Sequence, residues 1–344
     1  MKEIKVLMLS KREHCSQILT GLLMLESGGG GGRYCVKISD LTENVDFPNH
    51  HTPLVGIEYL GKKIIIDVED GYWDKSGMEY YLNWCDYYFK RSYSLEKNNE
   101  FTQHLKDKIR PFGLNYAVYY RNNPYNTIGW SVQELVKNLA GKKPAGYFTP
   151  SKFEEEPKRK NTPVVLFSCR LWEPSEKLPQ YLNEEREYIN QTRINLVRQL
   201  KKEYGKYFVG GVQKSAYAMQ YAKDILLPRT MTERGRYLKT LHQSDICIGT
   251  MGLHKSIGWK TAEYVAASKG IVNETLHYEV PGNFLEGKNY LAFITNEECM
   301  TGVSKLVDDP DLLFQMKVNN RQYYENYLRP DMLIKQVLKI VEAD

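Results

Sequence analysis

The feature that most constrains the fold of this chain is a series of short apolar runs, each long enough for one buried strand. The runs are Ile4 to Leu9, Lys63 to Asp67, Tyr87 to Lys90, Ile109 to Pro111, Val164 to Ser168, Tyr207 to Gly210, Ile246 to Ile248 and Ile271 to Asn273. Segments with a helical spacing of apolar residues lie between them, among them Ser16 to Leu25, Met78 to Trp84, Leu182 to Lys202 and Tyr237 to Gln243. Strands buried on both faces alternate with helices in parallel α/β sheets. The pattern therefore predicts an α/β fold.

The length of 344 residues predicts two domains, because a single hydrophobic core rarely serves so long a chain. The region from Gly141 to Thr162 is rich in proline and charge, which is typical of a linker. We therefore expect an N-terminal domain over residues 1–150, a linker over 151–162 and a C-terminal domain over 163–330. Within the first domain, Gly28 to Gly32 predicts a mobile connector and Ser131 to Leu139 a further helix.

The composition is that of a soluble globular protein. Hydrophobic residues make up 42% of the chain and charged residues 26%, near globular averages, which argues against a disordered or collagen-like chain. The formal net charge is +5 and the basic residues are spread along the chain, so nucleic-acid binding is not indicated. The same charge suits a nucleotide diphosphate or a phosphorylated lipid, with ordinary surface solvation as the alternative.

Cysteine spacing and hydropathy indicate the cytoplasm. The cysteines include no C-x-x-C pair and have no histidine at metal-ligand spacing, so we expect neither a metal site nor disulfides. The apolar run from Ile4 to Leu9 is too short for a signal-peptide core, and nowhere is an apolar run long enough for a membrane-spanning helix. We expect a cytoplasmic protein whose membrane contact, if it has any, is peripheral and on the inner face of the membrane.

The stretch from Gly252 to Glu274 joins a glycine turn, a helix and a buried strand. Ser256 and Gly258 open the turn, Trp259 to Ser268 has the pattern of a helix, and Gly270 predicts a left-handed stop. The first N–H groups of a helix have no partner within it, so they can bind an anion.

Charged side chains beside this helix start fit a nucleotide diphosphate. Lys255 and Lys260 add positive charge, and His254 is placed to face a phosphate. Glu263, about one turn into the helix, would accept hydrogen bonds from two ribose hydroxyls. Gly211 would let the backbone approach the donor, with helix packing as the alternative.

This turn and helix resemble the donor-binding core of GT-B glycosyltransferases, in which two glutamates separated by seven residues bracket a Gly-Phe-Gly-like turn. Glu263 matches the second glutamate and Gly258 the second glycine, whereas Lys255 occupies the position of the first glutamate. The similarity extends from about Thr162 to the end of the chain, through Phe284 to Phe293, Asp308 to Pro310 and Asn319 to Glu325.

The resemblance implies a GT-B fold, in which two Rossmann-like domains face each other across a cleft. The C-terminal domain would bind the nucleotide sugar and the N-terminal domain the acceptor, and residues 331–344 would form a helix that packs back on the N-terminal domain. Arg170, just after the first strand of the C-terminal domain, would neutralise the leaving diphosphate without a metal or another cofactor. A surface ion pair with Glu173 or Glu176 is the alternative for Arg170.

Side chains that follow strands of the N-terminal domain are the candidates for acceptor chemistry, because ligands bind beyond the carboxyl ends of parallel strands. Asp70 is the expected base that takes the proton of the acceptor hydroxyl, and His14 is its rival. An ordinary Asp-Gly turn is the alternative for Asp70. The acceptor-binding candidates are Tyr72 and Trp73, which would stack on a sugar, and Lys90 and Arg91, which would bind an anion or simply be solvated.

The sequence thus predicts a glycosyltransferase that moves a sugar from a nucleotide sugar to a glycan or lipid-linked acceptor in surface polysaccharide biosynthesis. An epimerase of the same fold would turn over the donor alone. A catalytically silent subunit would bind glycan without transfer, an alternative that Lys255 and the 12% aromatic content keep open. A nicotinamide-dependent dehydrogenase is disfavoured, because no G-x-G-x-x-G follows the first strand.

Overall fold

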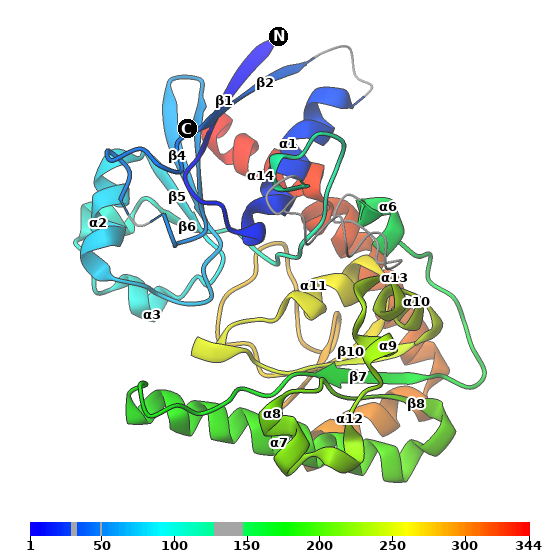
Figure 1. Cartoon of the computed structure of the whole chain (residues 1–344). Coiled ribbons are helices and arrows are strands. Elements are labelled where there is room, and N and C mark those ends of the chain that lie inside the picture. The colour runs from blue at the N-terminus through cyan, green and yellow to red at the C-terminus, as the bar shows by residue number, and fades with distance from the viewer. Residues whose placement is uncertain (29–32, 49, 127–146) are drawn as a thin grey trace. The chain divides into compact units, whose positions relative to one another are not determined.

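The computed structural model describes residues 1–28, 33–48, 50–126 and 147–344. The glycine run from Gly28 to Gly32 lies almost entirely outside the described residues, and the predicted helix from Ser131 to Leu139 lies wholly outside them. The chain divides into two compact units (Figure 1). Unit 1 consists of Met1–Lys152, His277–Asn283 and Tyr323–Asp344, and unit 2 consists of Phe153–Leu276 and Phe284–Gln322.

Unit 1 contains a mixed sheet with its strands in the order β2-β1-β3-β4-β5-β6. The strands are β1 (Lys2–Met8), β2 (Tyr34–Asp40), β3 (Leu54–Tyr59), β4 (Lys62–Asp67), β5 (Tyr87–Lys90) and β6 (Ile109–Pro111). β3 runs antiparallel to both β1 and β4, whereas the other described pairs are parallel. The prediction of a parallel sheet is therefore wrong at β3. Leu60 and Gly61 have φ angles of 50° and 76° and close a tight hairpin between β3 and β4.

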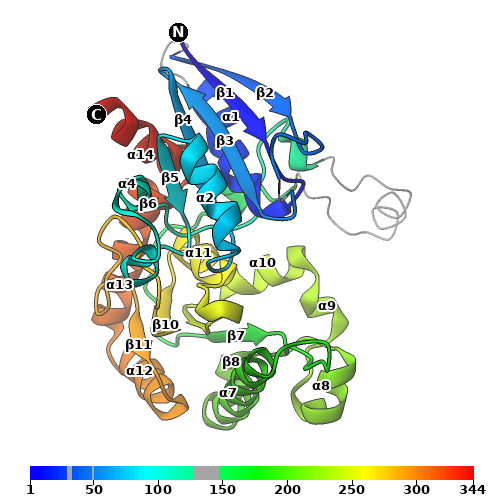
Figure 2. The same cartoon turned by 90° about the vertical axis from the view of Figure 1, so that its left-hand side faces the viewer.

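Helices cover both faces of the sheet of unit 1 (Figure 2). The helical segments are η1 (Glu13–Cys15), α1 (Ser16–Ser27), α2 (Lys75–Trp84), α3 (Leu95–Asn98), α4 (Gln103–Lys106), η2 (Pro124–Asn126), η7 (Tyr324–Leu328) and α14 (Pro330–Ala343). On one face, α2 packs with Ile65 and Tyr88 of the sheet. On the other face, α1 contacts α14 at Gly21, where any side chain would collide with the carbonyl oxygen of Pro330.

Unit 2 contains a sheet in which every described pair of strands is parallel, in the order β11-β10-β9-β7-β8. The strands are β7 (Val165–Cys169), β8 (Phe208–Val212), β9 (Ile246–Gly249), β10 (Gly270–Glu274) and β11 (Leu291–Phe293). The chain passes from β7 to β8 on one side and then returns to β9 on the other side of β7. The carboxyl ends of β7 and β9 therefore flank a topological switch point, the position where open α/β sheets bind their ligands.

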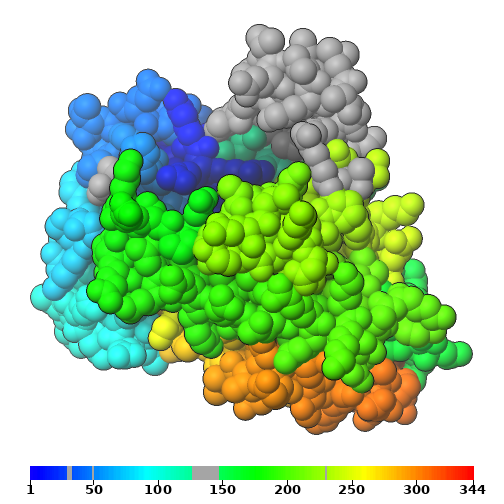
Figure 3. Space-filling model, turned by 60° about the horizontal axis from the view of Figure 1, so that its bottom comes forward, coloured from blue at the N-terminus to red at the C-terminus, as the bar shows by residue number. Residues whose placement is uncertain are grey.

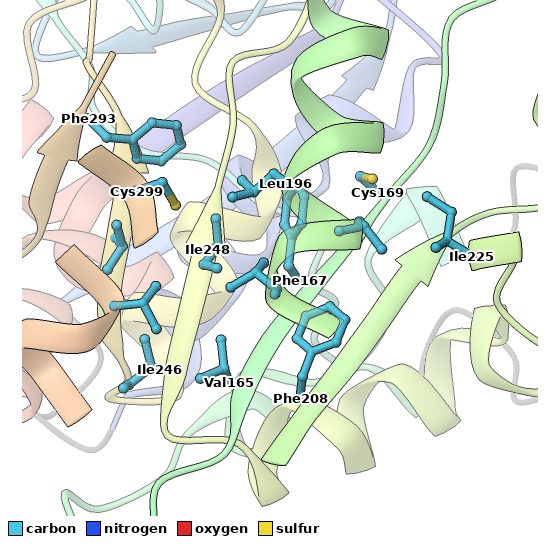
Figure 4. Packing of buried hydrophobic residues seen from close by; sticks show 14 of the residues in the cluster. Val165, Phe167, Cys169, Leu196, Phe208, Ile225, Ile246, Ile248, Phe293 and Cys299 are labelled. Carbon is cyan, nitrogen blue, oxygen red and sulfur yellow. The ribbon is translucent and has the colours of Figure 1, made fainter. Parts of the chain in front are cut away.

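Helices pack on the sheet of unit 2 and complete its core. The helical segments are α7 (Gln180–Tyr204), η4 (Gly205–Tyr207), α8 (Ala216–Tyr221), η5 (Lys223–Ile225), α9 (Arg229–Thr232), α10 (Arg234–Gln243), η6 (Leu253–Lys255), α11 (Trp259–Ala266), α12 (Asn296–Asp308) and α13 (Pro310–Tyr323). Val165, Phe167 and Ile248 of the sheet pack with Leu196 of α7 and Cys299 of α12 (Figure 4). Figure 3 views a face of unit 2 on which α7 (green) and α12 (orange) lie at the surface. Within the residues described, no helix has both the length and the apolar composition needed to cross a bilayer.

The charged segment over residues 151–162 contains the end of a short helix, α6 (Pro150–Phe153), and belongs to unit 2 from Phe153 onward. Polar contacts hold it there. The carboxylate of Glu155 pairs with Lys269 at 2.7 Å, and the carbonyl oxygen of Glu155 accepts a hydrogen bond from the Ser268 hydroxyl at 2.6 Å. Most of the segment predicted as a linker is therefore fastened to unit 2.

Candidate anion-binding site

The candidate site lies at the carboxyl ends of β7 and β9, which are followed by Arg170 and by a tight turn that leads into α11. In the turn, the N–H of Gly252 donates to the carbonyl oxygen of Ser256 at 2.8 Å. His254 and Lys255 both have left-handed backbone angles, with φ of 59° and 56°. Such angles are costly for residues other than glycine and persist only where the surrounding structure imposes them. The turn therefore holds a fixed, strained shape directly before the helix.

The start of α11 follows Gly258, which has no side chain to cap the helix. The N–H of Thr261 donates to the carbonyl oxygen of Gly258 at 3.1 Å, and the positive end of the helix dipole at this start favours an anion. The predicted stop of this helix at Gly270 is wrong, because the left-handed residue after α11 is Ser268, with φ of 53°. Gly270 opens β10 instead, where a side chain would collide with Leu313 of α13. Packing, not helix termination, requires this glycine.

Three cationic side chains from different elements lie near one another at this site. Lys260, in the first turn of α11, donates to the hydroxyl oxygen of Ser168 at 2.8 Å and also to the carbonyl oxygen of that residue. Burial, with repulsion from the charges of Arg193 and Arg170, lowers the pKa of Lys260 to about 8. The guanidinium of Arg170 lies 3.8 Å from the ring centroid of Trp172. Arg170 and Arg193 thus lie close enough to Lys260 for their charges to disfavour its charged form.

Two buried charged residues of the site were not predicted from the sequence, Arg193 in α7 and Glu274 at the end of β10. Arg193 donates to the hydroxyl oxygen of Thr250 at 3.0 Å and to the carbonyl oxygens of Arg170 and Met251, both at 2.7 Å. Glu274 accepts a hydrogen bond from the N–H of Met251 at 2.9 Å. Burial lowers the pKa of Arg193 and raises the pKa of Glu274. Glu274 could have been predicted as a site residue because it ends a strand. Arg193 lies within a long helix, and nothing in its sequence position marks it as a site residue.

Glu263 is buried on α11, near α10. Arg234 of α10 approaches its carboxylate at 3.9 Å. Burial raises the pKa of Glu263, and the charge of Arg234 opposes this shift. The contact of Glu263 with a ribose stays a prediction.

The remaining predicted donor residues have different environments. His254 and Lys255 are exposed in the turn, and Ser256 is buried beside Gly252. Gly211 lies within β8 with φ of 149°, and a side chain there would come within 2.5 Å of the carbonyl oxygen of Ile225. Packing within unit 2 is thus sufficient to account for Gly211, and its contact with a donor stays a prediction.

In unit 1, predicted residues from three strand ends come together. His14 follows β1, Asp70 follows β4 and Arg91 follows β5. A nitrogen of the Arg91 guanidinium donates to the carboxylate of Asp70. Burial lowers the pKa of His14, while the charge of Asp70 opposes this shift and the charge of Arg91 adds to it. A carboxylate, an imidazole and a guanidinium therefore share one edge of the sheet.

Lys90, Tyr72 and Trp73 form a second group, around the buried carboxylate of Asp67. The Lys90 ammonium lies 3.0 Å from Asp67, and neither side chain is exposed. The Trp73 indole N–H and the Tyr88 hydroxyl donate to the same carboxylate oxygen at 2.9 and 2.6 Å. The Lys90 ammonium also lies 5.2 Å from the ring centroid of Tyr72. Lys90 is thus enclosed within unit 1, whereas Tyr72 and Trp73 are partly exposed.

No family model matches this sequence, and no curated protein matches it. Solved structures do show a likeness. The C-terminal domain of a glycosyl transferase group 1 family protein (LpcC) from Francisella tularensis is 12% identical with a TM-score of 0.34, covering 51% of this chain and 95% of that one. The UDP-GlcNAc 2-epimerase from Neisseria meningitidis bound to UDP-GlcNAc is 13% identical with a TM-score of 0.41, covering 78% and 65%. Anabaena Alr3699/HepE in complex with UDP is 10% identical with a TM-score of 0.41, covering 81% and 72%. The solved structures that this chain is similar to thus include a glycosyl transferase group 1 family protein and an epimerase.

Proposed function

We propose that unit 2 binds the diphosphate of a nucleotide sugar and that the protein is a glycosyltransferase. The observation that carries this proposal is the group of cations at the switch point of unit 2, formed by Arg170, Arg193 and Lys260. Within the part of the chain that the structure describes, no carboxylate lies within 4.0 Å of the charged nitrogens of Arg193 or Lys260. Arg193 and Lys260 are like charges with only neutral hydrogen-bond acceptors, an arrangement that favours an anionic ligand beside them.

The start of α11 adds to this preference. Lys260 lies in its first turn, where the helix N–H groups already favour negative charge. A diphosphate carries enough negative charge to interact with both Lys260 and Arg170. The buried Glu263, further along the same helix, is our candidate for the ribose hydroxyls. The nucleotide would thus lie along α11, with its phosphates at the helix start.

The same cations would promote the chemical step. When the bond between the sugar and the diphosphate breaks, negative charge grows on the leaving oxygen. Arg170 and Lys260 would stabilise this charge more strongly in the transition state than in the bound donor, which is the condition for catalysis. We propose a reaction without a metal ion on this basis.

For the acceptor we propose Asp70 as the base and Arg91 as the residue that holds it in place. Their hydrogen bond orients the carboxylate, and His14 lies near enough to be affected by the charges of both. The acceptor would be a glycan or a lipid-linked sugar in surface polysaccharide biosynthesis, reached from the cytoplasm. Tyr72 and Trp73 remain our candidates for stacking on this acceptor.

A panel of nucleotides and nucleotide sugars tests the proposal. A donor that binds the native protein should raise its melting temperature, whereas the matching nucleoside without phosphates should not. The best donor is then incubated with the protein, alone and with candidate glycans, and the products are identified by NMR. Transfer that requires a glycan supports the glycosyltransferase. Conversion of the donor alone indicates an epimerase, and glycan binding without donor turnover indicates a silent subunit.

A further inference from the structure

A buried arginine joins the two loops that carry the candidate anion site. Arg193 is only 7% exposed, and its guanidinium donates to acceptors on both the loop after β7 and the loop after β9. We propose that Arg193 is a positioning residue, which holds these loops in the geometry that binds the donor diphosphate without touching the ligand itself. This inference rests on the proposed function of unit 2.

Core packing alone does not explain an arginine at this place. Its acceptors are two backbone carbonyl oxygens and one hydroxyl oxygen, and the described residues offer its guanidinium no carboxylate within 4.0 Å. The charge of Glu274 favours the charged form of Arg193, but burial outweighs it and lowers the pKa of Arg193. A buried cation with no carboxylate in direct contact is costly, so an apolar side chain would serve packing better. Arg198 on the same helix shows the ordinary arrangement, since it is partly exposed and forms two hydrogen bonds to the carboxylate of Asp224.

The contacts of Arg193 fix the backbone on both sides of the switch point. After β7 it holds the carbonyl oxygen of Arg170, whose side chain is our candidate for the phosphate. After β9 it holds Met251 by its carbonyl oxygen, while Glu274 holds the N–H of the same residue. Both backbone polar groups of Met251 are therefore occupied inside unit 2. The turn that leads to α11 begins at the next residue, Gly252, so its path depends on this anchor.

The planar guanidinium explains why the position needs arginine rather than lysine. Three of its N–H groups point to three separate acceptors in a fixed fork, which a single ammonium on a flexible stem cannot reproduce. A lysine at this place would keep the charge but release at least part of the contact network. Charge and positioning can therefore be separated by experiment.

The test compares Arg193→Lys with Arg198→Lys, the same change at the exposed position of α7. A second pair, Thr250→Val and Thr250→Ser, removes or keeps one acceptor of Arg193. For each folded variant we would measure the affinity for inorganic pyrophosphate by calorimetry, the melting temperature, and amide hydrogen exchange over residues 250–256. These measurements use the full chain.

We expect Arg193→Lys to weaken pyrophosphate binding about tenfold or more and Thr250→Val to weaken it about threefold to tenfold. Exchange over residues 250–256 should become faster in both variants. Thr250→Ser and Arg198→Lys should stay close to wild type. If Arg193→Lys does not fold, the Thr250 pair decides the question.

The proposal is overturned if Arg193→Lys or Thr250→Val lowers the melting temperature while affinity and loop exchange stay unchanged, since that is the behaviour of a merely structural residue. Failure of the proposed function gives a different result. In that case the wild-type protein binds neither pyrophosphate nor any nucleotide of the panel, whatever the variants do.

Discussion

At the scale of single residues, Lys260 makes the proposed site sensitive to pH. Its pKa is lowered to about 8 in the folded protein, and anion binding needs the charged form. Nucleotide affinity should therefore be full below pH 8 and fall as the pH rises above it, by up to about tenfold per pH unit. Calorimetry between pH 7 and 9.5 would measure this fall.

Two variants of Lys260 would show whether its charge causes the fall in nucleotide affinity. Lys260→Met should bind weakly at every pH in that range, and Lys260→Arg should bind without the fall above pH 8, because arginine stays charged. A wild-type affinity that does not change between pH 7 and 9.5 would show that Lys260 does not contact the anion.

The base assignment in unit 1 is also a question about single residues. Asp70→Asn should lower the rate of transfer about 100-fold or more while leaving donor affinity unchanged, because the amide cannot take a proton. His14→Gln is the matched variant, and we expect a smaller loss. The rate would be measured with the donor and acceptor found in the panel. Near-normal transfer by Asp70→Asn together with a loss in His14→Gln would assign the base to His14.

Residues were predictable from the sequence where a strand end marks them. Arg170 directly follows β7, and Lys260 is the second residue of α11. The structure places these two side chains near each other at the switch point of unit 2. The environment of Lys90 was not predictable in this way, because its neighbour Arg91 points to Asp70 while Lys90 itself is enclosed with Asp67. At the end of a strand, successive side chains point to opposite faces of the sheet. The sequence does not show which of these faces is covered by other parts of the protein.

At the scale of elements, the charged segment before β7 depends on one carboxylate. Burial alone would raise the pKa of Glu155, but hydrogen bonds from His242 and Lys269 and the charge of Lys269 outweigh it and lower the pKa to about 2. Because the pKa of Glu155 in the folded protein lies below the ordinary glutamate value of 4.5, its contribution to stability is present above pH 4.5 and is lost as the pH falls toward 2.

We therefore expect Glu155→Gln to lower the free energy of unfolding near pH 6 by about 1 to 3 kcal/mol and to flatten its decline in acid. Denaturant unfolding between pH 2 and 6 would measure both effects. Glu176→Gln, at an exposed position of unit 2, is the control and should change neither. Equal stability of wild type and Glu155→Gln at pH 6 would mean that this ion pair does not hold the segment.

Most strands and the helices α1, α2, α7, α10 and α11 were predictable as elements, because each carries a local pattern of apolar residues, whereas β2, β3, β11, α12 and α13 were not predicted. β3 was missed since its pairing depends on the Leu60-Gly61 hairpin and not on the alternation of strands and helices. The end of α11 was misplaced for a similar reason. A glycine suggests a helix stop, but Gly270 is required by Leu313, which lies far away in the sequence.

At the scale of the whole molecule, two α/β units were predictable from the restart of the strand and helix pattern, but their composition was not. Unit 1 includes His277–Asn283 and Tyr323–Asp344, segments that follow most of unit 2 in the sequence. Only the resemblance to GT-B glycosyltransferases implied that the chain returns to the N-terminal domain, and it did so only for the last helix. Gly21 of α1 contacts Pro330 at the start of α14. A local sequence pattern does not reveal this packing, because the two residues lie far apart in the sequence.

We propose above all that unit 2 binds a nucleotide sugar by its diphosphate at the carboxyl ends of β7 and β9. A crystal structure of the full chain with the best donor of the panel would show where the diphosphate binds. We expect phosphate oxygens within hydrogen-bond distance of both Arg170 and Lys260, next to the first turn of α11. A donor whose phosphates lie elsewhere, with neither side chain in contact, would contradict this proposal.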